Sequence, residues 1–380
     1  MLPAHSITAT VLACAAFSVA PVAATTYSMV KEYYGSSFFN EWTFYNYYDN
    51  LTNGDVNYVS AQNATAYQLA YVDSSTNHAI IKVDNTSTVV YNNKRNSVRI
   101  TSNDSFAVGS LWVADMYHVP YGCSVWPAWW SQAPLWPQGG EIDTFEGINT
   151  NTQNQMSLHT ESGCMAVSQN QTSTLVTSTN CSYASNEDQG CIVTDPSTSS
   201  YGAGFASSGG GAFVTEMAST GISIWFFPRA QIPSSLSSNG STIDTSTFGI
   251  PVANWPSTGC NVSQYFQPQN LIFDITLCGG TWFTADGVTW NATCSGICYN
   301  NWVMGSGSDY NDAYFEVGYV RVFSTQGTNT VVPSGGTTAS SGSSPTTSPT
   351  SSNSAVALPH DGVWMAATVL ALVGFFSSAL

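Results

Sequence analysis

The chain has 380 residues, of which only 8% are charged, and its formal net charge is −16. An acidic surface repels the phosphate backbone, so this balance argues against a nucleic-acid-binding protein. Aromatic residues make up 13% of the chain and include 12 Trp. Most aromatic side chains belong to hydrophobic cores. The high aromatic content nevertheless favours a neutral carbohydrate as the ligand, because sugar rings lie flat on indole faces.

The N-terminal segment predicts entry into the secretory pathway. Residues 1–24 contain an apolar run and small residues at Val22 and Ala24, which suit cleavage after Ala24. The start of the segment lacks Lys and Arg, so a transmembrane anchor is the alternative. We expect a signal peptide over residues 1–24 and a secreted, extracellular protein.

Cysteines and glycosylation sequons agree with that compartment. Apart from Cys14 in the leader, an even number of cysteines remains, which predicts up to four disulfides. Short spacing favours the pairs Cys181/Cys191 and Cys294/Cys298, and the full connectivity stays open. A zinc site is the alternative for Cys294 and Cys298. Surface glycans are predicted by nine sequons, at Asn50, Asn63, Asn85, Asn103, Asn170, Asn180, Asn239, Asn261 and Asn291.

Residues 25–325 read as one all-β domain. No stretch of 15 residues has helical periodicity, whereas short runs rich in Val, Ile, Tyr, Phe and Thr are bounded by Gly, Pro, Asn and Ser. Such runs predict a sandwich of two antiparallel sheets. Alternation within residues 313–323 predicts Phe315, Val317 and Tyr319 on one face of a strand. The predicted strands fall near residues 96–102, 110–119, 153–160, 211–220, 221–229, 270–279 and 313–323.

The C-terminal part predicts a tether. Residues 326–353 are rich in Ser, Thr, Pro and Gly, which is typical of an extended stalk that carries O-linked glycans. Residues 354–380 combine small residues, a short spacer and an uncharged apolar tail, as in a GPI-anchor signal that is removed on maturation. A tail-anchored helix is the alternative. We expect membrane attachment through a GPI lipid anchor, at the cell surface or in the cell wall.

Three carboxylates stand close together in the segment "GGEIDTFEGIN". Glu141 and Asp143 share one face of a strand, but Glu146 falls on the opposite face because side chains alternate. A β-bulge near Thr144 and Phe145 absorbs one residue and turns all three carboxylates to the same side. Glycosidases use two carboxyl groups that flank the scissile bond. The alternatives are an exposed acidic edge or a calcium site.

This segment resembles the Glu-x-Asp-x-x-Glu signature of glycoside hydrolase family 16. More closely, the chain is similar to fungal endo-1,3(4)-β-glucanases of the laminarinase type. The similarity extends to "GCSVWPAWW", "PLWPQGGEID", "TQNQMSLHT", "IWFFPR" and "FDITLCG", and it covers most of residues 25–325. The bulged form of the signature favours laminarinases over lichenases and fungal wall transglycosylases. The resemblance implies a β-jelly-roll sandwich, like that of concanavalin-type lectins, with a substrate cleft on its concave sheet.

The resemblance also implies roles for individual residues. Glu141 corresponds to the nucleophile and Glu146 to the acid/base, while Asp143 orients Glu141 and modulates its charge. His159 is expected beside the carboxylates in the substrate-binding cleft, and a purely structural histidine is its alternative.

Tryptophans are the expected sugar platforms. Trp136 and Trp130 are favoured. Trp126 lies four residues before Trp130 and therefore faces the same side of a strand. Trp282 is expected to form a wall of the cleft from a loop. Trp129 faces the other way and is expected in the core.

The expected function is a retaining endo-glycoside hydrolase that cleaves β-1,3 and mixed β-1,3/1,4 glucans and works as a monomer. A cell-wall glucan transglycosylase on the same site is the first alternative. A non-catalytic, lectin-like glucan-binding protein is the second, and the three intact carboxylates argue against it. No cofactor is expected to be required, and a structural calcium ion is compatible with the resemblance.

Overall fold

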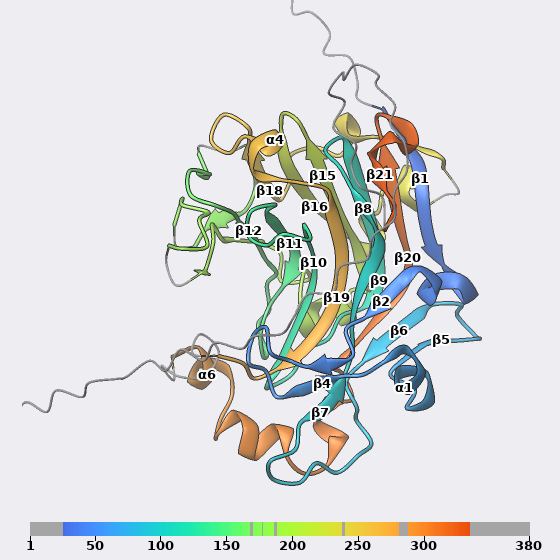
Figure 1. Ribbon diagram of the computed structural model, residues 1–380, viewed down its shortest axis with the longest axis vertical. Coiled ribbons are helices and arrows are strands. Elements are labelled where there is room, and N and C mark those ends of the chain that lie inside the picture. The colour runs from blue at the N-terminus through green and yellow to red at the C-terminus, as the bar shows by residue number, and fades with distance from the viewer. Residues whose placement is uncertain are drawn as a thin grey trace, which may run out of the picture. The chain divides into compact units, whose positions relative to one another are not determined.

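Two antiparallel sheets packed face to face make up the folded unit, as the sequence predicts (Figure 1). The computed structural model describes residues 26–334 except 168–169, 177, 186–187, 238–239 and 281–287. The chain divides into two units, Met1–Gly336 and Thr337–Leu380, and the described residues all belong to the first. Within the described residues, no helix has the length and apolar character needed to cross a membrane.

The first sheet has nine strands in the described chain. Its main path runs β17 (Thr242–Asp244), β1 (Thr26–Tyr34), β20 (Tyr314–Ser324), β9 (Ser110–His118), β15 (Gly211–Ala218), β16 (Gly221–Pro228) and β18 (Ala253–Pro256). Beside β20 the sheet is extended by β6 (Ala79–Lys82) and then β5 (Ala70–Val72).

The second sheet also has nine strands among the described residues and carries the carboxylates. Its path runs β13 (Thr174–Leu175), β14 (Val193–Thr194), β12 (Gln155–His159), β11 (Glu141–Glu146), β10 (Val125–Gln132), β19 (Gln269–Leu277), β8 (Arg99–Phe106) and β2 (Trp42–Phe44). Past the predicted end of the domain, β21 (Val331–Val332) pairs with β8. A small third sheet contains β3 (Tyr47–Tyr48), β4 (Val56–Tyr58) and β7 (Arg95–Ser97).

Helices in the described chain are short and lie in the connections between strands, as the lack of helical periodicity predicts. The α-helices are α1 (Ala61–Ala66), α2 (Gly202–Ser207), α3 (Ser234–Ser237), α4 (Val262–Tyr265) and α6 (Val288–Thr293). The tighter 3-10 turns are η1 (Gly35–Glu41), η3 (Arg229–Gln231), η4 (Thr245–Thr247), η6 (Gly307–Tyr310) and η7 (Gly327–Thr330), and η5 (Tyr299–Val303) is a π-helical turn.

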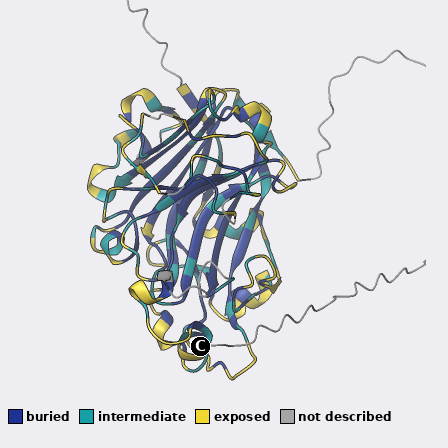
Figure 2. Cartoon of the chain, turned by 90° about the vertical axis from the view of Figure 1, so that its left-hand side faces the viewer, coloured by how far each residue is buried: buried dark blue, intermediate teal, exposed yellow. Residues whose placement is uncertain are grey.

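An aromatic core fills the space between the two large sheets. Phe145 of β11 packs edge-on against Phe213 of β15 and Phe315 of β20, with ring centroids 5.4 and 5.9 Å apart. Phe273 of β19 stacks on Trp129 of β10 at 4.2 Å. Figure 2 shows the strands as the buried part of the molecule, with exposed residues concentrated in loops and helices. The core therefore holds β11, the strand that carries the carboxylates, through the face that packs against the first sheet.

One predicted strand face is wrong in part. Phe315 and Val317 lie in the core between the sheets, but Tyr319 belongs to a second apolar cluster. The pairing of β20 with β9 shifts register on both sides of Val317, next to Gly318. Such an irregularity exchanges the two faces of the strand, so strict alternation fails beyond it.

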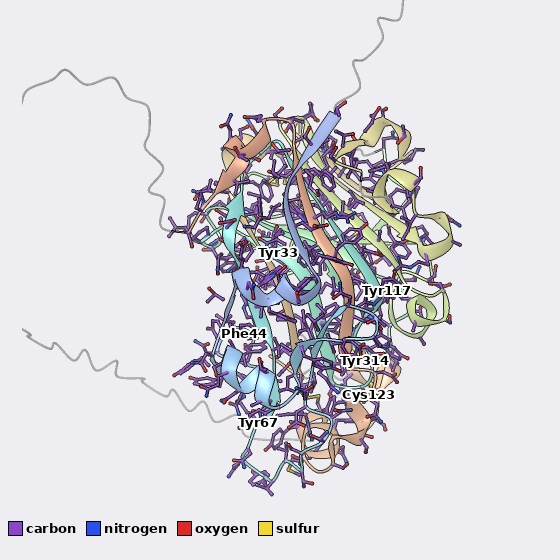
Figure 3. All side chains as sticks on the ribbon, turned by 90° about the vertical axis from the view of Figure 1, so that its right-hand side faces the viewer. Tyr33, Phe44, Tyr67, Tyr117, Cys123 and Tyr314 are labelled. Carbon is purple, nitrogen blue, oxygen red and sulfur yellow. A yellow bond between two sulfur atoms is a disulfide. The ribbon has the colours of Figure 1, made fainter. Side chains whose placement is uncertain are left out.

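Four disulfides connect loops around the cleft-bearing sheet, as expected for a protein that folds in an oxidising compartment. Cys181–Cys191 confirms the first local prediction. The predicted pair Cys294/Cys298 is wrong, because each sulfur reaches a partner outside that short segment. The observed bonds are Cys123–Cys294, with Cys123 labelled in Figure 3, Cys278–Cys298 and Cys164–Cys260.

Candidate active site

Strand β11 contains the β-bulge that the sequence predicts. Asp143 lies opposite Ser157 of β12, and Glu146 lies opposite Gln155, so three residue steps on β11 match two steps on β12. The pairing of β11 with β10 shifts at the same place. Thr144 is therefore the residue in excess, and the alternation of side chains restarts after it.

The bulge separates core residues from carboxylates. Ile142, Thr144 and Phe145 are fully buried, and the Thr144 hydroxyl lies 2.6 Å from the hydroxyl of Thr215 in the first sheet. Because these three side chains face the first sheet, Glu141, Asp143 and Glu146 all point to the outer side of the second sheet. The sequence prediction that the three carboxylates share one side is confirmed by this arrangement.

Asn154 completes the hydrogen bonds that the bulge leaves open. Its side-chain oxygen accepts a hydrogen bond from the backbone N–H of Glu146, and its Nδ2 donates to the carbonyl oxygen of Thr144, both at 2.9 Å. The side chain is fully buried, and such bonds are costly to lose. Sequence analysis missed this residue, because nothing distinguishes it from the other asparagines of residues 149–155.

A cleft of about 510 Å³ lies over the outer side of the second sheet. The strand order places Arg99 on β8 toward one end, together with the loop 51–53, and Asp188 toward the other. The lining residues are Leu51, Thr52, Asn53, Tyr58, Arg99, Trp126, Ala128, Trp130, Gln132, Trp136, Glu141, Asp143, Glu146, His159, Asp188, Gln189, Ile192, Asp274, Thr276 and Gly280. All three carboxylates are among the residues that line this cleft.

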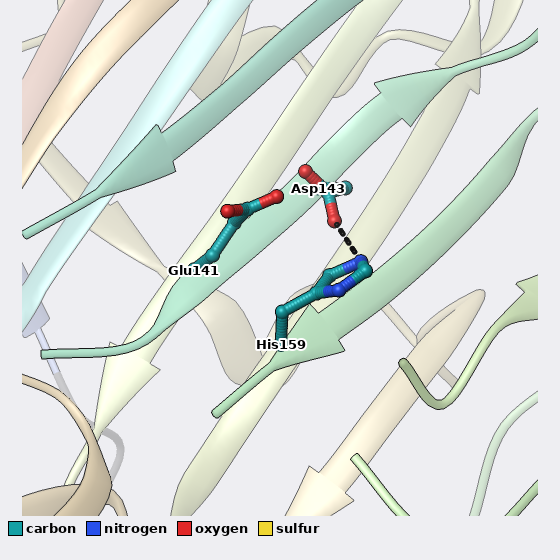
Figure 4. A group of neighbouring side chains, drawn as sticks. All are labelled: Glu141, Asp143 and His159. Atoms are coloured by element: carbon teal, nitrogen blue, oxygen red, sulfur yellow. Dashed lines mark ion pairs between the residues drawn. The ribbon is translucent and has the colours of Figure 1, made fainter. Parts of the chain in front are cut away.

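His159 lies between two carboxylates and beside a third. It is the register partner of Glu141, and its Nε2 is 3.3 Å from Asp143 Oδ2 (Figure 4). On its other side, Nδ1 is 3.2 Å from Asp188 Oδ1, on a loop that the Cys181–Cys191 disulfide closes. The Ser157 hydroxyl donates to the same Asp143 oxygen at 2.5 Å. Asp143 is thus fixed from two sides. Sequence analysis did not identify Asp188, which lies 29 residues from His159.

Two tryptophans donate directly to the glutamates. The indole N–H of Trp126 donates to Glu146 Oε1 at 2.8 Å, and that of Trp136 donates to Glu141 Oε2. Trp136 remains 39% exposed, so its ring is open to a ligand. These contacts join two of the predicted sugar platforms to the carboxylates.

Trp130 is held in the cleft by a charged pair. Its indole N–H donates to Asp274 Oδ1 at 3.2 Å, while Arg99 donates to Asp274 Oδ2 at 2.8 Å and lies 4.8 Å from the Trp130 ring centroid. Sequence analysis missed both charged residues. The signal for Asp274 was present, because it interrupts the apolar run "LIFDITL" of a predicted strand.

The predictions for Trp129 and Trp282 have different outcomes. Trp129 is fully buried in the core, as predicted. Trp282 lies outside the described residues.

Burial and mutual repulsion raise the pKa values of both glutamates. The pKa of Glu141 is raised well above its usual value by burial and by Asp143, against the opposing effect of His159. Burial and Asp143 raise the pKa of Glu146 to about 7. Burial alone lowers the pKa of His159, but the neighbouring Glu141 and Asp143 outweigh it and raise that pKa well above its usual value. A partly buried imidazolium therefore balances part of the negative charge of the carboxylates.

The cluster Glu141, Asp143 and His159 is not suited to bind calcium. Their ligand atoms lie within 4.8 Å of one another. Calcium takes six to eight oxygen ligands, whereas His159 offers nitrogens whose raised pKa favours the protonated form, which cannot bind a cation. A structural calcium ion elsewhere in the protein stays compatible with the resemblance and is not tested by the structure.

A jelly-roll sandwich whose cleft holds a bulged strand with three carboxylates is the architecture of a class of glycoside hydrolases. The family model described as the XgeA-like catalytic GH16 domain matches residues 42–323. The chain belongs to this family.

Two fungal relatives illustrate the similarity. A Schizosaccharomyces pombe protein named "Probable glycosidase" is 37% identical over 79% of this chain and 70% of its own length. An Aspergillus fumigatus protein named "Probable endo-1,3(4)-beta-glucanase" is 37% identical over 78% of this chain. The match covers only 45% of that longer relative.

Solved structures share the fold. Laminarinase 16A of Phanerochaete chrysosporium, with β-glucans in both its donor and acceptor sites, has a TM-score of 0.74 and is 34% identical. The match covers 78% of this chain and 99% of that one. A GH family 16 elongating β-1,3-glucosyltransferase has a TM-score of 0.71 and 34% identity, over 78% of this chain and 100% of its own.

Proposed function

We propose that this protein is a retaining endo-glycosidase that cleaves β-1,3 and mixed β-1,3/1,4 glucans of the laminarin type. The observation that carries the proposal is the bulged strand β11, which turns Glu141, Asp143 and Glu146 into one tryptophan-lined cleft. Membership of the GH16 family and the names of the relatives support the same substrate class.

In the proposed mechanism, Glu141 attacks the anomeric carbon while Glu146 gives its proton to the departing glycosidic oxygen. Glu146 then removes a proton from water, which attacks the anomeric carbon and releases the sugar from Glu141 with net retention. The pKa of Glu146, about 7, suits a group that must both give and take a proton near neutral pH.

Asp143 and His159 support the two glutamates. Asp143, held by Ser157 and His159, orients Glu141 and favours the protonated form of Glu146 by repulsion. The imidazolium of His159 favours the ionised form of Glu141, which is the form that attacks. Trp126, Trp130 and Trp136 are proposed sugar platforms, and Trp282 stays a prediction for the cleft wall.

A second candidate function is glucan transglycosylation. If another glucan chain replaces water in the second step, the same site elongates the acceptor. The structural similarity to an elongating β-1,3-glucosyltransferase favours this alternative over a lectin-like protein.

Product analysis on laminarin and on barley mixed-linkage glucan tests the proposal. We expect purified residues 25–334 to release short oligosaccharides of β-anomeric configuration. Products longer than the starting oligomers would assign transglycosylation instead. Binding of glucan without turnover would make the protein a lectin and exclude the mechanism.

The rate should depend on pH in a bell shape set by the two glutamates. Glu141 must be ionised, and its raised pKa moves the acidic limb of kcat/KM above the usual glutamate range. Glu146 must be protonated, so kcat/KM should fall as pH rises through about 7. In Trp126→Phe, loss of the N–H donor should raise the pKa of Glu146 and move the basic limb to higher pH. A basic limb unchanged in this variant would contradict the assignment of Glu146.

The two chain ends complete the proposal. We infer that residues 1–24 direct secretion, and that the part of the predicted stalk (residues 326–353) that follows β21 and the signal at residues 354–380 place the enzyme on a GPI anchor at the cell surface or wall. The disulfides support an extracellular location. Deletion of residues 354–380 should release the protein into the medium, whereas retention in the membrane would contradict the anchor.

A further inference from the structure

An exposed pair of tyrosines lies close to one end of the cleft. Tyr47 and Tyr48 form the strand β3, and they are 55% and 46% exposed. Their ring centroids are 4.4 Å apart and their planes are tilted by 34°. Large aromatic side chains that stay in water often mark a binding surface when they are grouped.

The pairing of β3 places Tyr47 on the cleft side, and the Tyr48 ring lies against the Tyr47 ring. Tyr47 is the register partner of Tyr58 on the antiparallel strand β4. Residues directly opposite each other in such a pair project from the same face, and Tyr58 lines the cleft. Leu51, three residues after Tyr48, also lines the cleft and is 49% exposed. The tyrosine pair thus continues the rim beyond Leu51.

The segment that carries the pair is held in place. The Tyr45 ring packs edge-on against Tyr58 at 5.8 Å, and its hydroxyl donates to Asn50 Oδ1 at 2.7 Å. The buried Asp49 carboxylate accepts hydrogen bonds from the backbone N–H groups of Leu51 and Thr52, both at 3.0 Å. A binding surface fixed before the ligand arrives loses little conformational entropy on binding.

The chemistry of the segment suits a neutral ligand. Asp49 is the single charged residue of residues 45–54, and it is buried and fully hydrogen-bonded. The exposed part presents aromatic rings, amides and an aliphatic side chain. Such a surface offers stacking and hydrogen bonds to sugar hydroxyls, and it offers no partner for an ionic ligand.

We propose that Tyr47 and Tyr48 form a remote subsite that binds glucosyl units of a long glucan where it leaves the cleft past Leu51. This inference rests on the proposed glucanase function and extends it to chain-length preference. The subsite stacks on sugar rings that take no part in bond cleavage, so it increases the affinity for polymers over that for short oligosaccharides.

The test compares Tyr47→Ala/Tyr48→Ala with Tyr67→Ala, which removes an equally exposed tyrosine at the C-terminal end of α1 (Figure 3). Secretion into a bacterial periplasm forms disulfides and leaves Asn50 without a glycan. The ratio of kcat/KM for laminarin to that for laminaritetraose should fall about five- to tenfold in the double variant, the loss expected when aromatic anchors are truncated. The ratio should stay unchanged in Tyr67→Ala. An unchanged ratio in the double variant would overturn the proposal.

A binding assay separates this proposal from the proposed function. In the background of Glu141→Gln, the fraction bound to insoluble β-1,3-glucan should fall with the tyrosine pair removed, whether or not the wild type cleaves glucan. Wild-type protein that binds glucan but does not cleave it would therefore contradict the proposed glucanase function. The proposal of a tyrosine subsite would remain. A wild-type dimer that the double variant cannot form, with glucan binding unchanged, would assign the pair to a contact between copies and overturn the subsite.

Discussion

Replacing Glu141 by glutamine is expected to lower the rate of glucan cleavage at least about a thousandfold while the protein stays folded. The amide has nearly the same shape as the carboxylate, but it cannot form the covalent intermediate with the anomeric carbon. Glu141 is partly buried beside like charges that raise its pKa, so loss of its charge removes repulsion from the folded state. The melting temperature should therefore not fall. Initial rates on laminarin and thermal unfolding measure the two effects.

Glu32→Gln is the matched control. Glu32 also accepts a hydrogen bond, from Arg321 at 2.7 Å, but it does not line the cleft. Its replacement should leave the rate within about twofold, since an exposed ion pair contributes little. Turnover by Glu141→Gln close to that of the wild type would remove Glu141 from the role of nucleophile.

Changes at Asn154 are expected to lower kcat about ten- to a hundredfold with little change in KM, because the residue holds the bulge and does not line the cleft. In Asn154→Ala, the Glu146 N–H and the Thr144 carbonyl lose their partners, which costs about 1–3 kcal/mol for each buried group. In Asn154→Asp, the acceptor remains but a carboxylate replaces the donor. The added negative charge close to Glu146 should raise the pKa of Glu146 and move the basic limb of kcat/KM to higher pH.

Asn270→Ala is the matched control for this effect. Asn270 also lies at a register shift, between β19 and β8, and its side chain donates to the carbonyl oxygens of Ser102 and Asp104 at 2.9 and 3.1 Å. Its loss should lower the free energy of unfolding without changing kcat. Equal kinetic effects at Asn154 and Asn270, with an unshifted pH profile in Asn154→Asp, would show that Asn154 acts on stability alone.

The local pattern of the sequence predicted the fold class and the carboxylate face. Ile142 and Phe145 are both apolar but three residues apart, which no regular strand can place on one face. A bulge is the local solution, and the extra residue Thr144 is where the pattern requires it. Alternation also assigned Trp129 to the core and Trp126 and Trp130 to the cleft. Period-2 alternation is a property of neighbouring residues, so a sequence contains it directly.

Alternation of side chains failed to predict the faces of β20, where the strand is irregular but the sequence gives no chemical sign of the irregularity. Gly318 gives no pattern comparable to the three carboxylates, so the exchange of faces before Tyr319 was not predicted. Cysteine pairing failed for a related reason. Spacing favoured Cys294 with Cys298, but both sulfurs bond to residues brought close by the packing of distant loops.

The sequence by itself determined that Glu141, Asp143 and Glu146 face the cleft and that one residue must be absorbed between Asp143 and Glu146. The tertiary structure alone decided what holds those groups: Asn154 against the bulge, Asp188 beside His159, and Arg99 with Asp274 at Trp130. Arg99 and Asp274 are 175 residues apart in the chain and meet because β8 pairs with β19. Local patterns report which face a side chain takes, whereas its partners depend on strand order, which only the folded chain defines.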